Sequence, residues 1–240
     1  MPHRFFILAY NSFLDTLFPW KCTFCQKESE FNYPLCQNCL LKIQLFNQFI
    51  CPVCHKRLFN PNKTCHFNPL KALGVVGFYE DEILKEVILT FKYKKIKSLV
   101  LPLASLMIYF LKNNSYFLNL QKENLVIIPI PLHQKREQLR GFNQTELLAL
   151  KVSAYFSIEL LNNVLVRIKN NPPQAEIKNL NEREKNIKGV FEIKNLEKIK
   201  NKTILLIDDV YTTGATLNEA AKILKQNGAK SIIGVVLAKS

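Results

Sequence analysis

The stretch ILLIDDVYTTGATLNEA, residues 204–220, decides the fold of this chain. An apolar run leads directly into Asp208 and Asp209, and threonines and a glycine follow before a helical pattern begins. The run predicts a buried strand whose carboxyl end presents two acids. Backbone N–H groups at the start of a helix, helped by threonine hydroxyls and the helix dipole, favour a phosphate, and Gly214 lets the backbone approach it. Carboxylates beside a phosphate cradle suit the vicinal hydroxyls of a sugar phosphate.

The chain around this stretch alternates strand-like and helix-like segments. Strands are expected at residues 72–79, 124–131, 203–207 and 231–238. Helices are expected at residues 81–93, 98–111, 145–156 and 216–228. This alternation predicts an α/β fold with a mostly parallel sheet covered by helices on both faces. Ligands of such sheets bind beyond the carboxyl ends of the strands, where Asp208 and Asp209 fall.

Composition indicates a globular protein with a polyanionic partner. The 240 residues are 48% hydrophobic, enough for a real core, and carry a formal net charge of +14. Such a charge favours nucleic acid, phosphorylated ligands or anionic lipid, although a generally lysine-rich composition would also produce it. No stretch is long and apolar enough for a spanning helix, because Pro102 interrupts the apolar run 98–111.

Three segments are expected from the N-terminus onward. Residues 1–20 have apolar side chains at helical spacing and predict an amphipathic docking helix, with membrane anchoring as the alternative. Residues 21–71 hold all seven cysteines and predict a small cysteine-rich domain, and residues 72–240 carry the α/β pattern.

The first four cysteines have the spacing of a zinc site. Two pairs, each separated by two residues, place four thiolates on two tight turns, as a tetrahedral structural zinc ion requires. Disulfides are the alternative. The expected ligands are Cys22, Cys25, Cys36 and Cys39.

A second set repeats the first after a shift of 29 residues, and indicates an internal duplication. The shift lands on Cys51, Cys54 and Cys65, but on Asn68 in place of the fourth cysteine. Either His66 substitutes as a ligand of a second zinc, or this half is metal-free and held by packing, which the pattern slightly favours. Pairing of cysteines between the two halves also stays open.

The segment LLIDDVYTTGATL resembles the signature of type I phosphoribosyltransferases, which binds phosphoribosyl pyrophosphate (PRPP) with magnesium. The resemblance implies that Asp208 and Asp209 hold the ribose hydroxyls and take part in any catalysis. It also implies that the following residues surround the 5′-phosphate. Those residues are Val210, Tyr211, Thr212, Thr213, Gly214, Ala215 and Thr216.

A wider resemblance joins both halves of the chain. The segment IPIPLHQKREQLRGFNQTELLA, residues 128–149, is similar to the ComF family, whose members join a zinc segment to a phosphoribosyltransferase domain and include proteins of bacterial DNA uptake. Residues 90–93 and 174–191 match further family segments. The family implies that Pro131 and Leu132 contact the pyrophosphate through their backbone. It also implies a mobile basic loop over the pyrophosphate, with Arg140 as a catalytic candidate. That loop comprises Lys135, Arg136, Arg140, Gly141, Phe142, Asn143 and Gln144.

Other positions of the family pattern are matched or altered. Arg183, Asn186 and Gly189 fall in the last family segment, which Gln174 begins. A glycine is usual where this chain has Lys95, and a threonine is frequent where it has Asn171 and Pro172. These departures leave the acceptor of any transferred phosphoribosyl group undefined.

Three functions compete. The first is handling of incoming single-stranded DNA during natural transformation, at the cytoplasmic face of the inner membrane and beside the DNA-uptake machinery. The second is an enzyme that transfers phosphoribose to a nucleobase, and the third is an RNA- or protein-binding adaptor that senses PRPP. The charge and the cysteine segment favour the first, because aromatic residues interleaved with basic ones suit single strands. The candidate DNA contacts are Lys92, Lys94, Lys95 and Lys97.

Overall fold

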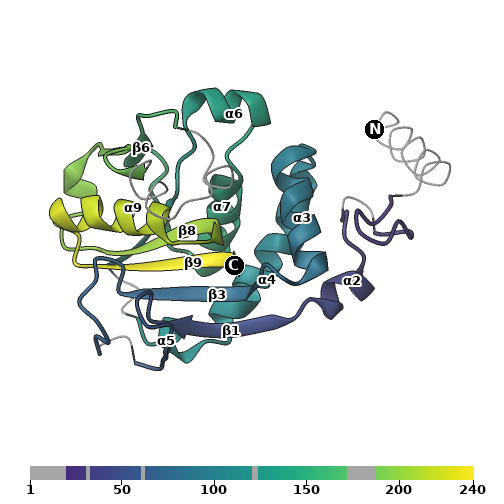
Figure 1. Ribbon diagram of the computed structural model, residues 1–240, viewed down its shortest axis with the longest axis horizontal. Helices are drawn as coiled ribbons and strands as arrows, with labels where there is room; N and C mark the ends of the chain where they lie inside the picture. The colour runs from purple at the N-terminus through teal and green to yellow at the C-terminus, as the bar shows by residue number, and fades with distance from the viewer. Residues whose placement is uncertain (1–19, 31–32, 61–62, 121–123, 172–186) are drawn as a thin grey trace, which may run out of the picture.

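The computed structural model describes residues 20–30, 33–60, 63–120, 124–171 and 187–240, and Figure 1 shows their arrangement. The expected N-terminal helix therefore lies outside the described residues, except for its last residue, Trp20. None of the helices in the described ranges is long and apolar enough to cross a bilayer.

A seven-stranded sheet forms the centre, in the order β2-β1-β3-β9-β8-β4-β5. The five strands from β3 to β5 in this order run parallel, while β1 and β2 add an antiparallel edge. The bounds are β1 Leu45–Ile50, β2 Arg57–Leu58, β3 Ala72–Phe78, β4 Leu125–Pro129, β5 Glu159–Leu160, β8 Thr203–Tyr211 and β9 Ser231–Lys239. The α/β fold expected from the sequence is confirmed.

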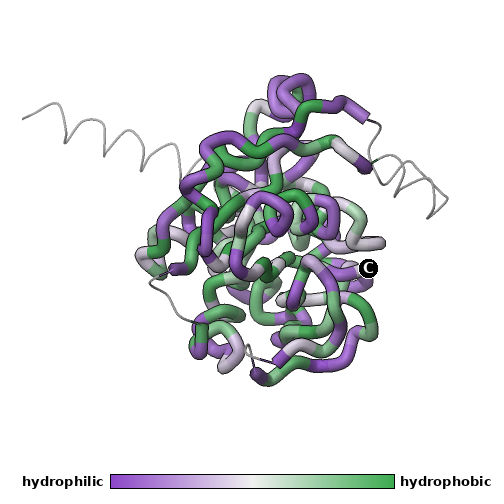
Figure 2. Tube along the Cα trace, turned by 90° about the vertical axis from the view of Figure 1, so that its left-hand side faces the viewer, coloured by the Kyte–Doolittle hydropathy of each residue, from purple (hydrophilic) through white to green (hydrophobic). Residues whose placement is uncertain are grey.

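The apolar strands pack on both faces because their side chains alternate. On β8, Leu205 and Ile207 join one core cluster, and Ile204 and Leu206 join the other. Figure 2 shows hydrophobic residues recurring along the trace between hydrophilic ones. A sheet buried on both faces needs helices on each side, and the chain provides them.

Among the helices that the structure describes in full, three long ones supply buried side chains to the first core cluster, and one supplies the second. The first face carries α3 Glu82–Tyr93, α4 Val100–Lys112 and α7 Gln144–Phe156. The second face carries α9 Ala215–Gln226 together with a small antiparallel sheet, β6 Leu165–Arg167 and β7 Phe191–Ile193, called here the hood. The shorter helical elements are α2 Gln37–Lys42, η1 Lys97–Leu99, α5 Ser115–Leu118, α6 Gln134–Arg140 and η4 Leu196–Lys198.

The helices expected at 81–93, 98–111, 145–156 and 216–228 are confirmed, with small shifts at their ends. Pro102 is accommodated because it lies in the first turn of α4, where its missing N–H has no helical partner to lose. The side chain of Asp81 caps α3 by accepting a hydrogen bond from the backbone N–H of Leu84, 2.9 Å away.

The sheet extends across the domain boundary expected at residue 72. Strand β1, from the cysteine-rich half, pairs with β3, with Phe49 opposite Gly74 and Ile50 opposite Leu73. Gly74 matters here, because a Cβ at that position would lie 2.8 Å from rings of Phe49 and Phe110. The division of the chain at residues 20 and 71 stays a prediction, but the two halves share one sheet.

Candidate functional site

Asp208 and Asp209 lie on β8 itself, which runs to Tyr211 and is longer than the strand expected at 203–207. Taken as whole residues, Asp208 is 8% exposed and Asp209 is 5% exposed. Alternation along β8 directs Asp208 to the side of Ile204 and Leu206, where the hood lies, and Asp209 to the side of α3 and α7. Two neighbouring acids therefore have different surroundings.

Asp209 is held by polar side chains from two helices. Lys92 Nζ of α3 lies 2.8 Å from Asp209 Oδ1, and Gln144 Nε2 of α7 donates a 2.8 Å hydrogen bond to Oδ2. Arg140, at the end of α6, donates from Nη1 to Gln144 Oε1 at 2.7 Å. The contacts form a continuous chain from the basic helix α6 to the carboxylate of Asp209.

Gln144 has a defined position because the start of α7 is tied to the end of β4. Asn143 caps the helix by accepting from the N–H of Thr145, and its own amide donates to the carbonyl of Ile130 at 3.3 Å. The Thr145 hydroxyl donates to the same carbonyl. Buried side chains paired in this way orient Gln144 toward Asp209.

Asp208 is the carboxyl that titrates near neutrality. Burial, together with the charge of Asp209, raises its pKa to about 7, and the charges of Lys92 and Arg167 oppose that rise. One oxygen of Asp208 accepts a 2.9 Å hydrogen bond from the backbone N–H of Asp209. This carboxyl therefore retains its proton to a higher pH than an ordinary aspartate does.

The threonine-rich turn joins β8 to α9. Gly214 adopts φ +79° immediately before α9, and the hydroxyl of Thr213 accepts from the N–H of Ala215 at 3.3 Å. A Cβ at Gly214 would collide with the phenol group of Tyr211, at 2.7 Å from its Cε2 atom. Glycine is thus required both by backbone conformation and by space. The turn presents backbone N–H groups at the start of a 12-residue helix, which suits a phosphate.

The basic segment expected as one mobile loop is instead two helices. Lys135, Arg136 and Arg140 lie on α6, whereas Phe142, Asn143 and Gln144 are buried at the start of α7. Gly141, at φ +83°, separates the two helices. The loop expectation fails because Phe142 packs against Phe91 and because Asn143 and Gln144 have buried hydrogen-bond partners.

These groups line one cavity of about 380 Å³, within the size range of small-molecule pockets. It contains Arg140 and every residue that the sequence assigned to the ribose hydroxyls, to the 5′-phosphate or to backbone contacts with the pyrophosphate. Those residues are Pro131, Leu132, Asp208, Asp209, Val210, Tyr211, Thr212, Thr213, Gly214, Ala215 and Thr216. Arg136 also lines it, whereas Lys135 is exposed on α6 and is not among the lining residues. One cavity thus contains carboxylates that can accept hydrogen bonds from hydroxyls, backbone N–H groups that can bind a phosphate, and arginines that can bind a diphosphate. The described residues therefore fit magnesium PRPP.

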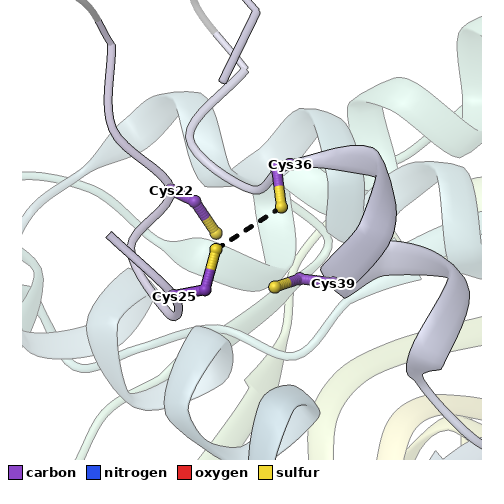
Figure 3. A group of neighbouring side chains, drawn as sticks. All are labelled: Cys22, Cys25, Cys36 and Cys39. Carbon is purple, nitrogen blue, oxygen red and sulfur yellow. Dashed lines mark hydrogen bonds between the residues drawn. The ribbon is translucent and has the colours of Figure 1, made fainter. Parts of the chain in front are cut away.

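The four first cysteines converge, as Figure 3 shows. Their sulfur atoms lie within 4.8 Å of one another, and those of Cys25 and Cys36 are 3.6 Å apart. A tetrahedral ion with Zn–S bonds of 2.3 Å would hold its sulfurs about 3.8 Å apart, so the donor set fits zinc. The thiols are free, and Cys22 and Cys39 are buried in the core.

The second set also converges within its own half. Cys54 and Cys65 have sulfurs 3.6 Å apart, and His66 Nδ1 lies 3.4 Å from the sulfurs of Cys51 and Cys65. His66 thus occupies the place of the missing fourth cysteine. This geometry favours a metal-bound second half over the metal-free interpretation, and it keeps the two ligand sets separate.

The four lysines expected to contact DNA do not lie together. Lys92 faces Asp209 with only 16% of its side chain exposed, so it belongs to the pocket. Lys94, Lys95 and Lys97 are exposed. Lys94 pairs with Glu86 at 3.2 Å, and Lys97 lies over the ring of Phe142.

Lys95 explains one departure from the family pattern. It has φ +58°, in the left-handed region where glycine costs least, which agrees with the glycine that the family resemblance implies here. Gly189, also expected from the family pattern, has φ +63° and its N–H donates to Glu219. Gln174, Pro172, Arg183 and Asn186 lie outside the described residues.

Comparison with known proteins agrees with this geometry. A model of the phosphoribosyl transferase domain matches residues 147–240, and a model of the double zinc ribbon domain matches residues 13–67. "Competence protein F" of Haemophilus influenzae is 30% identical over 212 residues, which cover 88% of this chain and 86% of that protein. The chain belongs to the ComF family.

Further relatives of this ComF-family protein vary in extent. "Competence protein ComFC" of Bacillus subtilis is 28% identical over 253 residues and covers 99% of this chain and 96% of that protein. "DNA utilization protein YhgH" of Escherichia coli (strain K12) is 30% identical over 106 residues, or 44% of this chain and 45% of that protein. The solved hypoxanthine-guanine phosphoribosyl transferase of L. donovani covers 64% of this chain and 71% of its own, at 11% identity and a TM-score of 0.31.

Some residues that line the pocket were not predicted from the sequence, and several of them lie outside the segments that carry the family motifs. Lys92 was counted with its lysine neighbours, but it lies four and eight residues after Ile88 and Leu84, both fully buried, on the inner stripe of α3. Arg167 closes a short apolar run, which was the only signal for it. The other missed lining residues are Tyr79, Leu89, Tyr93, Ile130, Thr145, Leu217 and Ser240.

Proposed function

We propose that this ComF-family protein binds magnesium PRPP in the described cavity and handles incoming single-stranded DNA during natural transformation. The observation that carries the proposal is the coincidence of two facts. The chain is similar to competence protein F across both its halves, and the Asp208–Thr216 segment lines a cavity with Arg136 and Arg140. The site of action in this proposal is the cytoplasmic face of the inner membrane, beside the DNA-uptake machinery.

In this proposal the carboxylates accept hydrogen bonds from the ribose hydroxyls. Asp209 keeps its two partners, Lys92 and Gln144, and adds a hydroxyl through a remaining lone pair, because each carboxylate oxygen can accept more than one hydrogen bond. The N–H groups at the start of α9 bind the 5′-phosphate. Magnesium bound with PRPP supplies positive charge to the pyrophosphate.

The pyrophosphate is assigned to the α6 side of the cavity. Arg136 and Arg140 line the cavity there from α6, and Pro131 and Leu132 supply backbone at the end of β4. The guanidinium of Arg140 lies 5.3 Å from the ring centre of Tyr93, which limits its movement. These cations suit the charge of a diphosphate.

The DNA contacts are proposed on the exposed side of the α3–α4 junction. Lys94, Lys95 and Lys97 are exposed there, and the neighbouring Tyr93 ring is 60% exposed. Cations that contact phosphates and an aromatic ring that stacks on bases are the usual components of sequence-tolerant single-strand binding. Zinc, bound by the two cysteine sets, has a structural role in this proposal because four protein ligands leave no open position.

A DNA titration tests this surface. Phosphate contacts release counterions, so log affinity for single-stranded oligonucleotides should fall linearly with log salt. Replacing Lys94, Lys95 and Lys97 by alanine should reduce that slope by about 0.7 for each phosphate that the variant no longer neutralises. The control replaces Lys198, Lys200 and Lys222, which are equally charged and exposed but lie on the α9 side.

Equal slopes for the two triple variants would remove the DNA surface from this region. In the cell, deletion of the gene should block transformation after DNA reaches the surface, without creating a purine or pyrimidine requirement. A base auxotrophy with normal transformation would contradict the proposed role in DNA handling.

A second candidate is a phosphoribosyltransferase that acts on a nucleobase or a related acceptor. Arg136 and Arg140, in the cavity where pyrophosphate would leave, favour it, because cations there stabilise the departing charge. Pyrophosphate release from PRPP, measured across a set of acceptors, tests this candidate. Release that depends on an acceptor supports the enzyme. PRPP binding without any release favours the role in DNA handling or a PRPP-sensing adaptor.

A further inference from the structure

Arg167 is a buried cation in the PRPP cavity that the proposed function leaves without a role. It ends strand β6 of the hood, is 8% exposed and lines the cavity from the side that faces Asp208. The roles proposed above use the α6 arginines for pyrophosphate and the α9 turn for the 5′-phosphate. Arg167 belongs to neither element.

The partners of Arg167 in the described part of the chain do not neutralise it. Its Nε donates a 3.3 Å hydrogen bond to the carbonyl of Lys169, and its guanidinium lies 5.9 Å from the ring centre of Phe191. No carboxylate among the described residues comes within 4.0 Å of it. A buried charge without a counterion costs free energy, and proteins usually supply a partner.

The electrostatic surroundings make an anion the missing partner. Burial and, to a lesser extent, the positive charge of Arg136 lower the pKa of Arg167 to about 10, while the charge of Asp208 acts in the opposite direction. The guanidinium nevertheless stays charged at neutral pH. Asp208, whose pKa is raised by burial, forms no ion pair with Arg167 within 4.0 Å, so it compensates the charge incompletely. The hood therefore holds a cation that the described protein compensates only in part.

We propose that Arg167 forms a subsite for an anionic group, a carboxylate or a phosphate, on a second small molecule that binds beside PRPP. The proposal rests on the proposed PRPP site and specifies the class of its second ligand. A planar guanidinium suits such groups because its donors match two oxygens at once. A neutral nucleobase would leave the buried charge uncompensated.

The size of the cavity restricts the ligand to a small molecule. About 380 Å³ must hold PRPP as well as the second ligand, and Arg167 lies within the cavity wall. The chemistry therefore points to a compact acceptor or effector that carries one anionic group.

Stability separates a ligand-binding role from a structural one. Arg167→Met keeps the length of the side chain and removes the charge. If Arg167 awaits a ligand, the melting temperature of the ligand-free protein stays unchanged or rises, because an uncompensated buried charge is lost. If Arg167 instead holds the hood together through Lys169, the melting temperature falls by several degrees, and the proposal is overturned. Arg57→Met is the matched control, because Arg57 also lies over a phenylalanine ring but is exposed and far from the cavity along the sheet.

Calorimetric titration then tests the subsite directly. The probes are orthophosphate, nicotinate and nicotinamide. Nicotinate carries a carboxylate at the position where nicotinamide carries a neutral amide. Each is added to the protein loaded with magnesium PRPP. We expect orthophosphate or nicotinate to bind and nicotinamide to bind more weakly. Arg167→Met should weaken the anions at least about tenfold, as the loss of hydrogen bonds to a charged group implies. Arg57→Met should change nothing.

Three results would overturn the subsite. The first is that neither anion binds the wild-type protein, and the second is that nicotinamide binds as tightly as nicotinate. The third is that Arg167→Met weakens the binding of magnesium PRPP as much as the binding of the anions, in which case Arg167 belongs to the PRPP site. Repeating the titration without PRPP separates this proposal from the previous one. A wild-type protein that binds no magnesium PRPP contradicts the proposed function, while an anion affinity that depends on Arg167 still supports the subsite.

Discussion

The ε-amino group of Lys92 lies 2.8 Å from a carboxylate oxygen of Asp209, and both side chains are largely buried, at 16% and 7% exposure. The pair joins helix α3 to the end of strand β8. Since Gln144 occupies the other oxygen of Asp209, three elements meet at one carboxylate. Asp209 is therefore oriented before any ligand arrives, which lowers the ordering cost of binding a sugar.

Lys92→Met should lower both stability and PRPP affinity. Removing one partner of a buried ion pair leaves the other charge uncompensated, so we expect a loss of about 3 kcal/mol in the free energy of unfolding, measured by urea titration. The charge of Lys92 also lowers the pKa of Asp208, so that pKa should rise in the variant.

Lys94→Met is the matched control for Lys92→Met. Lys94 forms an ion pair with Glu86 at 3.2 Å, but the two side chains are 63% and 41% exposed. An exposed pair of this kind contributes less than about 1 kcal/mol. Equal losses in the two variants would show that the Lys92–Asp209 pair has no special role in the pocket.

The pH dependence of stability should report on Asp208. Its pKa is about 7 in the folded protein and about 4 in an unfolded chain, so the folded state retains the proton through this interval. The stabilising contribution is complete below pH 4 and is lost as the pH rises through 7, by at most about 1.4 kcal/mol per pH unit. Asp208→Asn removes this contribution to the pH dependence of the free energy of unfolding.

The difference in unfolding free energy between Asp208→Asn and the wild type should therefore grow in favour of the variant from pH 5 to pH 8. Urea titrations at these two pH values provide the measurement. The comparison cancels the other titrating groups. A difference that is the same at both pH values would mean that Asp208 has an ordinary pKa.

The acids and the turn were predictable because their signals are local. An apolar run that ends in two acids predicts a strand end, and Gly214 before a helix predicts a close backbone approach. Lys92 could also have been found, from its four-residue spacing after Ile88, but its neighbours Lys94 and Lys95 suggested a surface. Consecutive basic residues on a helix point to different faces, so some of them are buried while their neighbours are exposed.

Arg167 and the metal sets show what local patterns leave undetermined. Arg167 reaches the cavity because β6 pairs with β7, where Arg167 lies opposite Phe191, 24 residues further along the chain. No pattern in the neighbouring sequence predicts that pairing. Cys51 and Cys65 share a site because the fold brings these two distant segments together. The spacing of the cysteines alone also allowed sites that combine cysteine pairs from both halves. Contacts between distant segments depend on packing, which periodicity does not encode.

Gly214→Ala should disrupt the phosphate turn. A Cβ there collides with Tyr211 and the backbone has φ +79°, so the turn must rearrange and PRPP affinity should fall by tenfold or more. Gly228→Ala is the control, because it has φ +96° but its nearest neighbour, Lys200, leaves 3.6 Å. Calorimetry should show normal PRPP affinity for the control with some loss of stability. Unchanged affinity in Gly214→Ala would contradict the phosphate role of the turn.

Elemental analysis should find about two zinc ions per chain, one for each ligand set. Cys39→Ser should lose the first ion and keep the second, and Cys65→Ser should do the reverse. Cys39→Ser should be the more destabilising change, because Cys39 is buried in the core while Cys65 is exposed. A single substitution that releases both ions would show that ligands are shared between the halves.

Thermal unfolding with and without magnesium PRPP tests the central claim most directly, in the wild type and in the double variant Asp208→Ala with Asp209→Ala. A ligand that binds only the folded state should stabilise the wild type by about 2.7 kcal/mol at a hundred times its Kd, and so raise its melting temperature. The double variant, confirmed as folded by circular dichroism, should show no rise. An equal rise in the double variant, or none in the wild type, would contradict a PRPP site at the end of β8.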